Sequence, residues 1–369
     1  MKKIMAVIGT RPEAIKMCPV IIELKKRKNV DLYVCVTGQH REMLRSVLDI
    51  FGVKADCDFD IMKDGQSLSD ITKAVMDGIS ETLKREMPDI VLVHGDTTTA
   101  FAASLACFYK GVPVGHVEAG LRTYDVRSPY PEEFNRRAID ITARWLFAPT
   151  RLSAENLLRE GLKEDNIYIT GNTAIDALEY TVDKDYSSPI TDAASGRRII
   201  LLTAHRRESH GEALRGIFRA VRRIADESDD VMIVYPVHPN PAVRTAAEEI
   251  LSGHERIMLT EPLDVIAFHN LMAKSFFIMT DSGGIQEEAP SLGKPVLVLR
   301  DTTERPEGIE AGTLKLVGTD EETIYQETRR LLTDGEEYRR MSRASNPYGD
   351  GHASERIADA IIEKFKDRS

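Results

Sequence analysis

Short unbroken apolar runs that alternate with amphipathic helical patterns constrain this chain more than any other feature. Runs rich in Val and Ile recur from the first residues, at Ile4–Ile8, Leu32–Val36, Ile90–Val93, Val114–Val117 and Trp145–Ala148. An apolar run without alternation is typical of a strand covered on both faces. Between the runs, apolar residues spaced by three or four trace one face of a helix. Alternating strands and helices predict a doubly wound α/β fold with a parallel sheet.

A pause in this pattern divides the chain. Over residues 183–197, Ser, Pro and Gly residues interrupt the periodicity, and further apolar runs follow. These runs are Ile199–Leu202, Val231–Tyr235, Phe276–Met279 and Val296–Leu299. Because 369 residues exceed the usual size of one such core, we predict two Rossmann-like domains, residues 1–175 and 176–352, with a cleft between them. The amphipathic segment 353–369 is expected to form a final helix, able to pack on either domain.

Composition narrows the class of partner. Lys and Arg total 49 against 59 Asp and Glu, a net charge of −10, which argues against nucleic acid or anionic lipid as a partner. No apolar stretch approaches the ~20 residues of a membrane span, so the sequence predicts a soluble protein. The four cysteines form no Cys-x-x-Cys pair, which predicts neither a metal site nor disulfides and fits a reducing cytoplasm.

Polar residues follow the first apolar run, where parallel sheets bind ligands beyond the carboxyl ends of their strands. Gly9-Thr10-Arg11-Pro12-Glu13 forms this turn, and Lys16 lies one helical turn after Pro12. Arg11 and Lys16 are suited to a phosphate near a helix start, although a plain turn with solvated charges fits these residues equally well. The segment is neither a Walker loop nor a Gly-x-Gly-x-x-Gly fingerprint, so we expect neither a triphosphate nor a dinucleotide.

Carboxylates stand at the ends of later strands in the first half. Asp96 and Glu118 follow the apolar runs at 90–93 and 114–117, so both are expected at one edge of the sheet. Asp96 also suits a helix N-cap, whereas a Glu that ends a Val-rich buried strand needs a partner or a function. Glu132 and Glu133 come after two prolines that shape a loop before a helix. The alternative role for either is to complement the helix dipole.

The second half repeats this arrangement with other residue types. His205, Arg206 and Arg207 follow the apolar run at 199–202 and suit a pyrophosphate, although a lone His is more often structural. Ser282-Gly283-Gly284 follows the run at 276–279, and its glycines allow backbone N–H groups to approach an anion. A flexible loop is the alternative interpretation. Glu288, one to two helical turns later, suits the two hydroxyls of a ribose.

Five segments in order form a distinctive set: Gly9–Lys16, His94-Gly95-Asp96, Gly115–Arg122, Thr280–Pro290 and Asp301–Glu307. Together they resemble bacterial non-hydrolysing UDP-N-acetylglucosamine 2-epimerases, over essentially the whole chain. The resemblance implies the GT-B architecture, with two Rossmann-like domains, the active site in the cleft between them and the final helix packed on the first domain. It also implies a homodimeric isomerase that needs no cofactor.

The resemblance assigns roles to individual residues. The implied catalytic residues are Asp96, Glu118, Glu132 and His205. The residues implied to hold the UDP-sugar are Arg11, Lys16, Asp96, Glu118, Arg136, His205, Leu263, Phe268, Ser282, Gly283, Gly284, Glu288 and Arg305. Relatives of the Bacillus type also bind a second UDP-N-acetylglucosamine as an activator, and the residues here that match its site are Gln39, Glu132, Arg206 and His238. Glu42 and Gly65 depart from that site, replacing Gln and Arg, so weaker activation is expected.

The implied reaction interconverts UDP-N-acetylglucosamine and UDP-N-acetylmannosamine, for cell-surface polysaccharide or teichoic acid synthesis. The proton on C2 is not next to a carbonyl carbon, so its direct removal is implausible, and elimination of UDP to 2-acetamidoglucal followed by re-addition avoids the problem. Asp96, Glu118 and Glu132 are the candidate acid/base groups, and the sequence does not assign one to each epimer. A hydrolysing epimerase, a GT-B glycosyltransferase and a UDP-sugar sensor are the alternatives, and carboxylates beside a diphosphate argue against the sensor.

Overall fold

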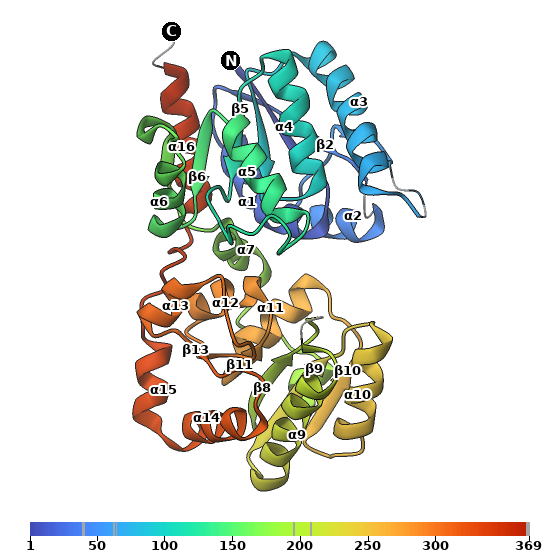
Figure 1. The fold of residues 1–369 in the computed structure, drawn as a ribbon, viewed down its shortest axis with the longest axis vertical. Helices are drawn as coiled ribbons and strands as arrows, with labels where there is room; N and C mark the ends of the chain where they lie inside the picture. The colour runs from blue at the N-terminus through green and yellow to red at the C-terminus, as the bar shows by residue number, and fades with distance from the viewer. Residues whose placement is uncertain (39–40, 62, 64, 195, 207–208, 367–369) are drawn as a thin grey trace. The chain divides into compact units, whose positions relative to one another are not determined.

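The computed structural model describes residues 1–38, 41–61, 63, 65–194, 196–206 and 209–366, except the side chains of residues 41–43 and 366. Two compact units divide the chain, one made of Met1–Tyr180 with Tyr348–Ser369 and the other of Thr181–Pro347 (Figure 1). This division lies at the end of helix α7 (Thr173–Thr181), and the division predicted between residues 175 and 176 falls inside the same helix.

The first unit is built on a sheet of seven parallel strands in the order β3-β2-β1-β4-β5-β6-β7. The strands are β1 (Lys2–Ile8), β2 (Val30–Val36), β3 (Cys57–Asp58), β4 (Ile90–His94), β5 (Val114–Val117), β6 (Trp145–Ala148) and β7 (Ile167–Ile169). The helices, besides α7, are α1 (Arg11–Lys25), α2 (Arg41–Ile50), α3 (Leu68–Glu86), α4 (Thr98–Lys110), α5 (Glu132–Thr142), α6 (Arg151–Arg159), the 3₁₀ helix η1 (Glu164–Asn166) and α16 (Ala353–Lys366).

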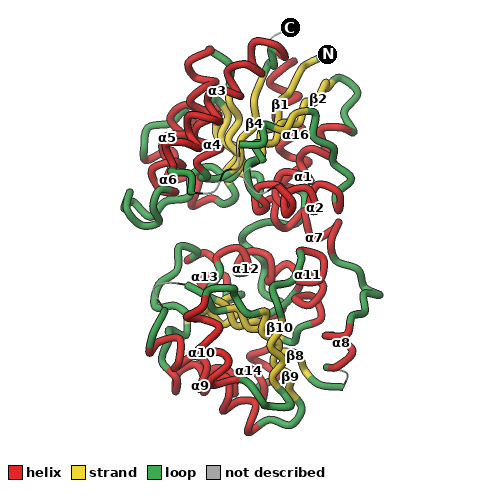
Figure 2. Tube along the Cα trace, turned by 90° about the vertical axis from the view of Figure 1, so that its right-hand side faces the viewer, coloured by secondary structure: helices red, strands yellow, loops and turns green. Residues whose placement is uncertain are grey.

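Helices cover both faces of this first sheet. Figure 2 shows α3, α4 and α5 on one face and α1 and α16 on the other. The side chains of Ile4–Ile8 are almost completely buried between these layers, as are those of Ile90–Val93. Burial on both faces explains why these two segments contain no polar residue. The last helix belongs to this unit, where the ring of Phe365 lies edge-on to Trp145 with 6.0 Å between centroids.

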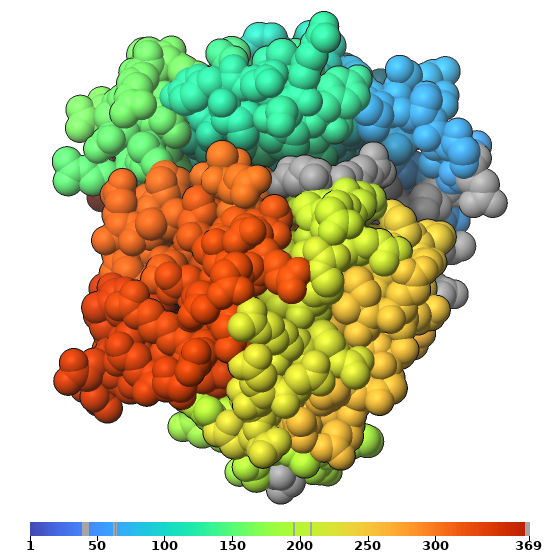
Figure 3. All heavy atoms as spheres, turned by 60° about the horizontal axis from the view of Figure 1, so that its bottom comes forward, coloured from blue at the N-terminus to red at the C-terminus, as the bar shows by residue number. Residues whose placement is uncertain are grey.

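The second unit has a sheet of six parallel strands in the order β10-β9-β8-β11-β12-β13. The strands are β8 (Arg198–Thr203), β9 (Val231–Pro236), β10 (Ile257–Thr260), β11 (Phe277–Thr280), β12 (Val296–Val298) and β13 (Leu314–Leu316). The helices are α8 (Pro189–Ala193), α9 (Glu212–Glu227), α10 (Pro241–Leu251), α11 (Val265–Lys274), α12 (Gly283–Glu288), η3 (Ala289–Leu292), α13 (Pro306–Ala311), α14 (Glu321–Thr333) and α15 (Gly335–Ser342). Figure 3 shows one face of this unit, with α9 and α10 in yellow beside the orange and red segments that include α14. The predicted fold of two doubly wound α/β domains is confirmed.

The strand order locates the ligand-binding edge of each sheet. In the first unit the order reverses between β1 and β4, and in the second between β8 and β11. At such a point the connecting helices leave to opposite faces, so the loops after the two strands leave a crevice at the carboxyl edge of the sheet. The residues that follow β1, β4, β8 and β11, and those that follow the neighbouring strands, are therefore the candidates for ligand binding in each unit.

Candidate active site

The turn after β1 is organised by Glu13. Thr10 is the N-cap of α1, and the Glu13 carboxylate accepts hydrogen bonds from the backbone N–H groups of Thr10 at 2.6 Å and Gly9 at 3.0 Å. Its other oxygen accepts from Thr97 Oγ1 at 2.8 Å, which ties this turn to the one after β4. Only Gly fits at position 9, because a Cβ there would lie 2.4 Å from Thr99 Oγ1. The sequence pattern marks Glu13 as part of the turn, but not as the residue that joins two turns.

Glu118, which follows β5, has a buried carboxylate surrounded by donors. Lys16 Nζ donates to Glu118 Oε2, and Asn172 Nδ2 donates to the same oxygen at 3.3 Å. His94 Nε2 lies 3.6 Å from it. Burial alone would raise the pKa of the Glu118 carboxyl, but the charge of Lys16, followed by the interaction with His94, outweighs burial and holds that pKa well below its usual range. The predicted phosphate ligand Lys16 is therefore bound to the predicted catalytic Glu118.

Asp96 lies in the turn after β4 and is held by α5. Arg136 Nη2 donates to Asp96 Oδ2 at 2.5 Å, and Asn135 Nδ2 donates to the Asp96 backbone carbonyl at 2.9 Å. The helix therefore fixes both the carboxylate and the main chain of this residue. Nearby, burial lowers the pKa of His94 against the opposing charge of Glu118, which favours the neutral imidazole.

The two adjacent glutamates at the start of α5 have different environments. Glu133 is fully buried, and its carboxylate accepts from the backbone N–H groups of Thr123 and Tyr124, each at 3.0 Å. Glu132 is half-buried, and its carboxylate forms no hydrogen bond or ion pair within the part of the chain that the structure describes. It precedes Arg136 by four residues, so both lie on one side of α5. Of the two carboxylates, that of Glu133 is held by the backbone, and that of Glu132 is not held by any described residue.

In the second unit, Asp281 organises the turn after β8. Its Oδ2 accepts from the backbone N–H groups of His205 at 2.6 Å and Arg206 at 2.7 Å, and its Oδ1 lies 3.3 Å from His205 Nδ1. The His205 ring stacks on that of His238, with 5.0 Å between centroids. Asp281 is fully buried and had no predicted role. The sequence could have indicated one, because Asp281 directly follows β11 and precedes Ser282.

The start of α12 brings together other predicted ligands. Gly283 is the first residue of the helix, and a Cβ there would lie 2.7 Å from the guanidinium carbon of Arg305. Arg305 Nε donates to Glu287 Oε1 at 2.9 Å, which holds the guanidinium over the helix start. One turn further on, Glu288 Oε2 lies 3.5 Å from His269 Nε2. A larger residue at position 283 would therefore displace the Arg305 guanidinium from the helix start.

A pocket of about 220 Å³ opens beside the turns after β8 and β9. Leu263 and Phe268, which sequence alone would assign to a hydrophobic core, both line it. The complete lining is Thr203, Ala204, His205, Tyr235, Pro236, Val237, His238, Pro239, Pro262, Leu263, Phe268, Ser282 and Ile285. Mostly apolar walls with a few polar groups are typical of small-molecule sites.

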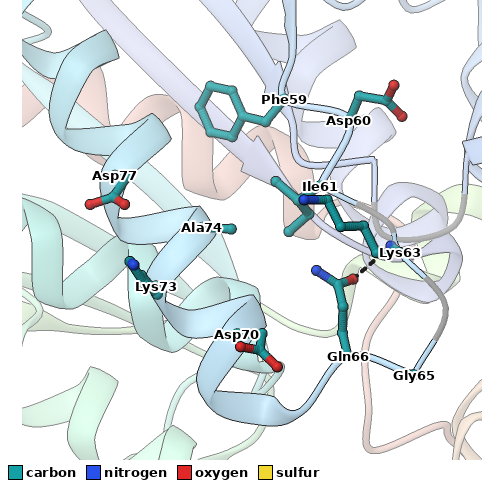
Figure 4. A pocket seen from close by; sticks show the side chains of 10 residues that line it. All are labelled: Phe59, Asp60, Ile61, Lys63, Gly65, Gln66, Asp70, Lys73, Ala74 and Asp77. Atoms are coloured by element: carbon teal, nitrogen blue, oxygen red, sulfur yellow. Dashed lines mark hydrogen bonds between the residues drawn. The ribbon is translucent and has the colours of Figure 1, made fainter.

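The predicted activator residues are only partly described. Gln39 lies outside the described residues, and so does the side chain of Glu42. Arg206 Nε donates to the Asp281 backbone carbonyl at 3.2 Å. Gly65 lines a separate pocket of about 550 Å³ between α3 and the segment after β3, with Asp70, Lys73, Ala74 and Asp77 on the helix side (Figure 4). None of the predicted substrate ligands lines that pocket.

Over the described residues, no group of three or more His, Cys, Asp or Glu side chains is arranged to hold a metal ion. Within the same residues, no helix is long and apolar enough to cross a membrane.

The two doubly wound units, with carboxylates at the strand ends of the first and an arginine over a glycine-rich helix start in the second, define a Rossmann-like α/β protein of the GT-B class. The model of the UDP-N-acetylglucosamine 2-epimerase family matches residues 22–362, and the chain belongs to this family.

Known proteins are similar to this chain over nearly its whole length. It is 59% identical to the UDP-N-acetylglucosamine 2-epimerase of Bacillus subtilis (strain 168), over 98% of this chain and 95% of that one. Among solved structures, the S. aureus MnaA complex with UDP is 52% identical with a TM-score of 0.92, covering 99% and 97% of the two chains. The UDP-GlcNAc 2-epimerase from Neisseria meningitidis bound to UDP-GlcNAc is 48% identical with a TM-score of 0.90, covering 98% and 100%.

Proposed function

We propose that this protein interconverts UDP-N-acetylglucosamine and UDP-N-acetylmannosamine without releasing free sugar, and that the product supplies cell-surface polysaccharide or teichoic acid synthesis in the cytoplasm. Family membership supports the activity, as does the named ligand of the Neisseria meningitidis structure. The observation that carries the proposal is the largely buried ion pair of Lys16 with Glu118, together with the partly buried pair of Arg136 with Asp96. Carboxylates withdrawn from water at strand ends need a partner or a function, and such groups are typical of acid/base chemistry.

The second unit is the proposed binding site for UDP. Uracil fits the pocket lined by Leu263 and Phe268, where the aromatic ring offers a stacking face. The diphosphate meets the Arg305 guanidinium and the backbone of Gly283, since a glycine permits close approach. Glu288 accepts hydrogen bonds from the ribose hydroxyls. His205, at the rim of the same pocket, faces the departing diphosphate.

The carboxylates of the first unit act on the sugar. The C1–O bond breaks and its electron pair leaves with UDP; a carboxylate takes the C2 proton, and the C–H electrons form the C1=C2 bond of 2-acetamidoglucal. A second acid/base group then delivers a proton to the other face of C2, and a UDP oxygen adds to C1. Every atom is conserved and no redox cofactor is needed. Asp96, Glu118 and Glu132 supply the acid/base groups, because proton transfer to either face requires at least two.

Activation by a second UDP-N-acetylglucosamine is proposed to be weak in this chain. The Arg206 guanidinium already contacts the Asp281 carbonyl and lies 3.7 Å from the Glu304 carboxylate. Glu42 and Gly65 replace residues that relatives use for the activator. Loss of a guanidinium and gain of a carboxylate both disfavour an anionic ligand.

A homodimer is proposed through the outer face of α4 and α5. Phe108 and Tyr109 on α4 are 59% and 68% exposed, and Phe134 and Ile141 on α5 are 51% and 72% exposed. Both helices follow parallel strands and run in the same direction, and the rings of Phe101 and Phe134 are in contact, with centroids 5.6 Å apart. Seven residues further along each helix come Phe108 and Ile141, so these side chains form one apolar strip, a feature typical of protein interfaces.

Proton NMR of UDP-N-acetylglucosamine with the purified protein in D₂O tests the proposed reaction. We expect UDP-N-acetylmannosamine to appear, with deuterium at C2 of both epimers and with no added nicotinamide or metal. Free N-acetylmannosamine with UDP would identify a hydrolysing enzyme instead. Unchanged, undeuterated substrate would contradict the epimerase assignment and leave a transferase or a sensor.

A further inference from the structure

His116 and Asp140 form a buried pair, and among the described residues neither side chain forms a hydrogen bond or ion pair with a proposed substrate ligand. His116 lies in β5 and Asp140 in α5, and both are completely buried. His116 Nδ1 is 2.6 Å from Asp140 Oδ1, and His116 Nε2 is 2.7 Å from the carbonyl oxygen of Gly95. A carbonyl only accepts, so Nε2 carries a proton and donates it.

The second oxygen of Asp140 is also occupied. It accepts from the backbone N–H of Gly120 at 3.3 Å and lies 2.7 Å from Arg122 Nη2. Arg122 in turn donates to both oxygens of Glu160, at 2.9 and 2.7 Å. Both ring nitrogens of His116 are therefore held by oxygen atoms, one from α5 and one from the turn after β4, and Asp140 is held in turn by Arg122 and Gly120.

The pair joins the two turns that carry the proposed catalytic carboxylates. Gly95 directly precedes Asp96, and Gly120 comes two residues after Glu118. Glu118 itself has a φ of 69°, in the left-handed region that is costly for a residue with a side chain. Such a conformation persists only where its surroundings fix it. Gly120 also packs closely against the backbone of Ser153, because a Cβ at position 120 would lie 2.2 Å from the Ser153 carbonyl oxygen.

We propose that His116 and Asp140 are a positioning pair, which sets the placement of the Asp96 and Glu118 carboxylates relative to each other. The proposal rests on the proposed function, in which these carboxylates exchange a proton with C2. One side chain, Asp140, contacts both the backbone two residues after Glu118 and the imidazole that holds the carbonyl directly before Asp96. The pair therefore controls the proton-transfer steps and leaves binding of UDP to the second unit unaffected.

The test is steady-state kinetics of His116→Gln and Asp140→Asn, with UDP binding measured separately. Gln lacks the two ring nitrogens that bridge Asp140 and the Gly95 carbonyl, and Asn replaces one carboxylate oxygen by an amide at nearly constant shape. A shift of about 1 Å in a reacting group costs on the order of 100-fold in rate, so we expect kcat to fall about 10- to 100-fold. KM and the Kd for UDP should stay within about 2-fold. Asp140→Asn is the more conservative change and carries the test if His116→Gln does not fold.

A control and a double-mutant cycle separate positioning from stability. Thr142→Val removes another hydrogen bond of α5, the 2.6 Å contact with Ser104 on α4, and should lower Tm without lowering kcat. In an Asp96→Asn background, His116→Gln should lower kcat by no more than about 3-fold, because it acts through Asp96.

Three results would overturn the positioning role: wild-type kcat in both folded variants, a parallel loss of UDP binding, or a full additional loss in the Asp96→Asn background. A wild-type protein that does not epimerise would instead contradict the proposed function.

Discussion

Replacing Glu13 by Gln tests whether the turn after β1 contains a carboxyl group that titrates near neutral pH. Burial raises the pKa of Glu13 to about 7, although hydrogen bonds from Thr97, Thr10 and Gly9 oppose the rise. Its side chain is almost wholly inaccessible, so water does not screen the effect. Gln has the shape of the neutral acid and can keep these contacts at any pH.

The sign and size of the effect follow from proton binding. Between pH 4.5 and 7 the folded protein holds a proton on Glu13 that the unfolded chain has lost, so the free energy of unfolding falls as pH rises, and above pH 7 the loss is constant. A pKa of about 7 instead of 4.5 corresponds to about 3 kcal/mol in total. Between pH 5 and 8, Glu13→Gln should therefore gain about 2 to 3 kcal/mol relative to wild type.

Thermal unfolding at pH 5 and pH 8 measures this gain. For a unit of this size we expect the Tm of Glu13→Gln to rise relative to wild type by roughly 5 to 10 °C between the two pH values. Glu81→Gln, which changes an exposed carboxylate on α3 of the same unit, is the matched control and should show no such trend. A Tm difference between Glu13→Gln and wild type that is the same at both pH values would refute the reasoning.

Three further substitutions probe the site and the surface. Lys16→Met removes the cation that keeps the pKa of Glu118 low, so that pKa should rise and the acidic limb of the kcat profile should move to higher pH; an unmoved limb would contradict the assigned pair. Phe268→Ala should raise KM and the Kd for UDP about 10- to 100-fold with kcat nearly unchanged, whereas a selective loss of kcat would argue against uracil stacking. Ile141→Glu should convert a dimer to monomers in sedimentation velocity, and an undisturbed dimer would exclude the α4–α5 strip.

The central strands could be predicted because burial on both faces leaves an unbroken apolar run. The edge strands β3 and β13 could not be predicted in this way, because they are less buried and carry no unbroken apolar run. β3 has two residues and β13 three, and the exposed or half-buried positions of each break the pattern. A parallel sheet places the carboxyl ends of all its strands at one edge, so the sequence also indicated that the turns after β1, β4 and β5 lie at the ligand-binding edge. The strand order itself came from the structure.

The partners of the site residues were harder to predict than the residues themselves. Strand-end position identified Asp96 and Glu118, but not that α5 would hold the first and α1 the second. These contacts join residues 40 and 102 positions apart in the chain, and no local pattern encodes them. Asn172 follows an edge strand that the apolar pattern does not reveal, which explains why its contact with Glu118 was not expected.

The ion pairs also distinguish the three carboxylates that are candidates for acid/base roles. A reaction that returns a proton to the opposite face of C2 needs one group that is ionised and one that carries a proton at the start of each direction. Lys16 holds Glu118 ionised, and Arg136 pairs with Asp96. Glu132 has no ion pair among the described residues, so it differs from both in lacking a fixed positive partner.

If Glu118 and Glu132 serve opposite faces of C2, their amide variants should fail in opposite directions. Glu132→Gln should still remove the proton that faces Glu118, and should therefore accumulate 2-acetamidoglucal and UDP from one epimer and leave the other intact. Glu118→Gln should show the reverse preference. Proton NMR of each variant with each UDP-sugar measures both products directly. Glucal formed from the same epimer by both variants would place the two carboxylates on one face of C2, and Asp96 would then have to serve the other.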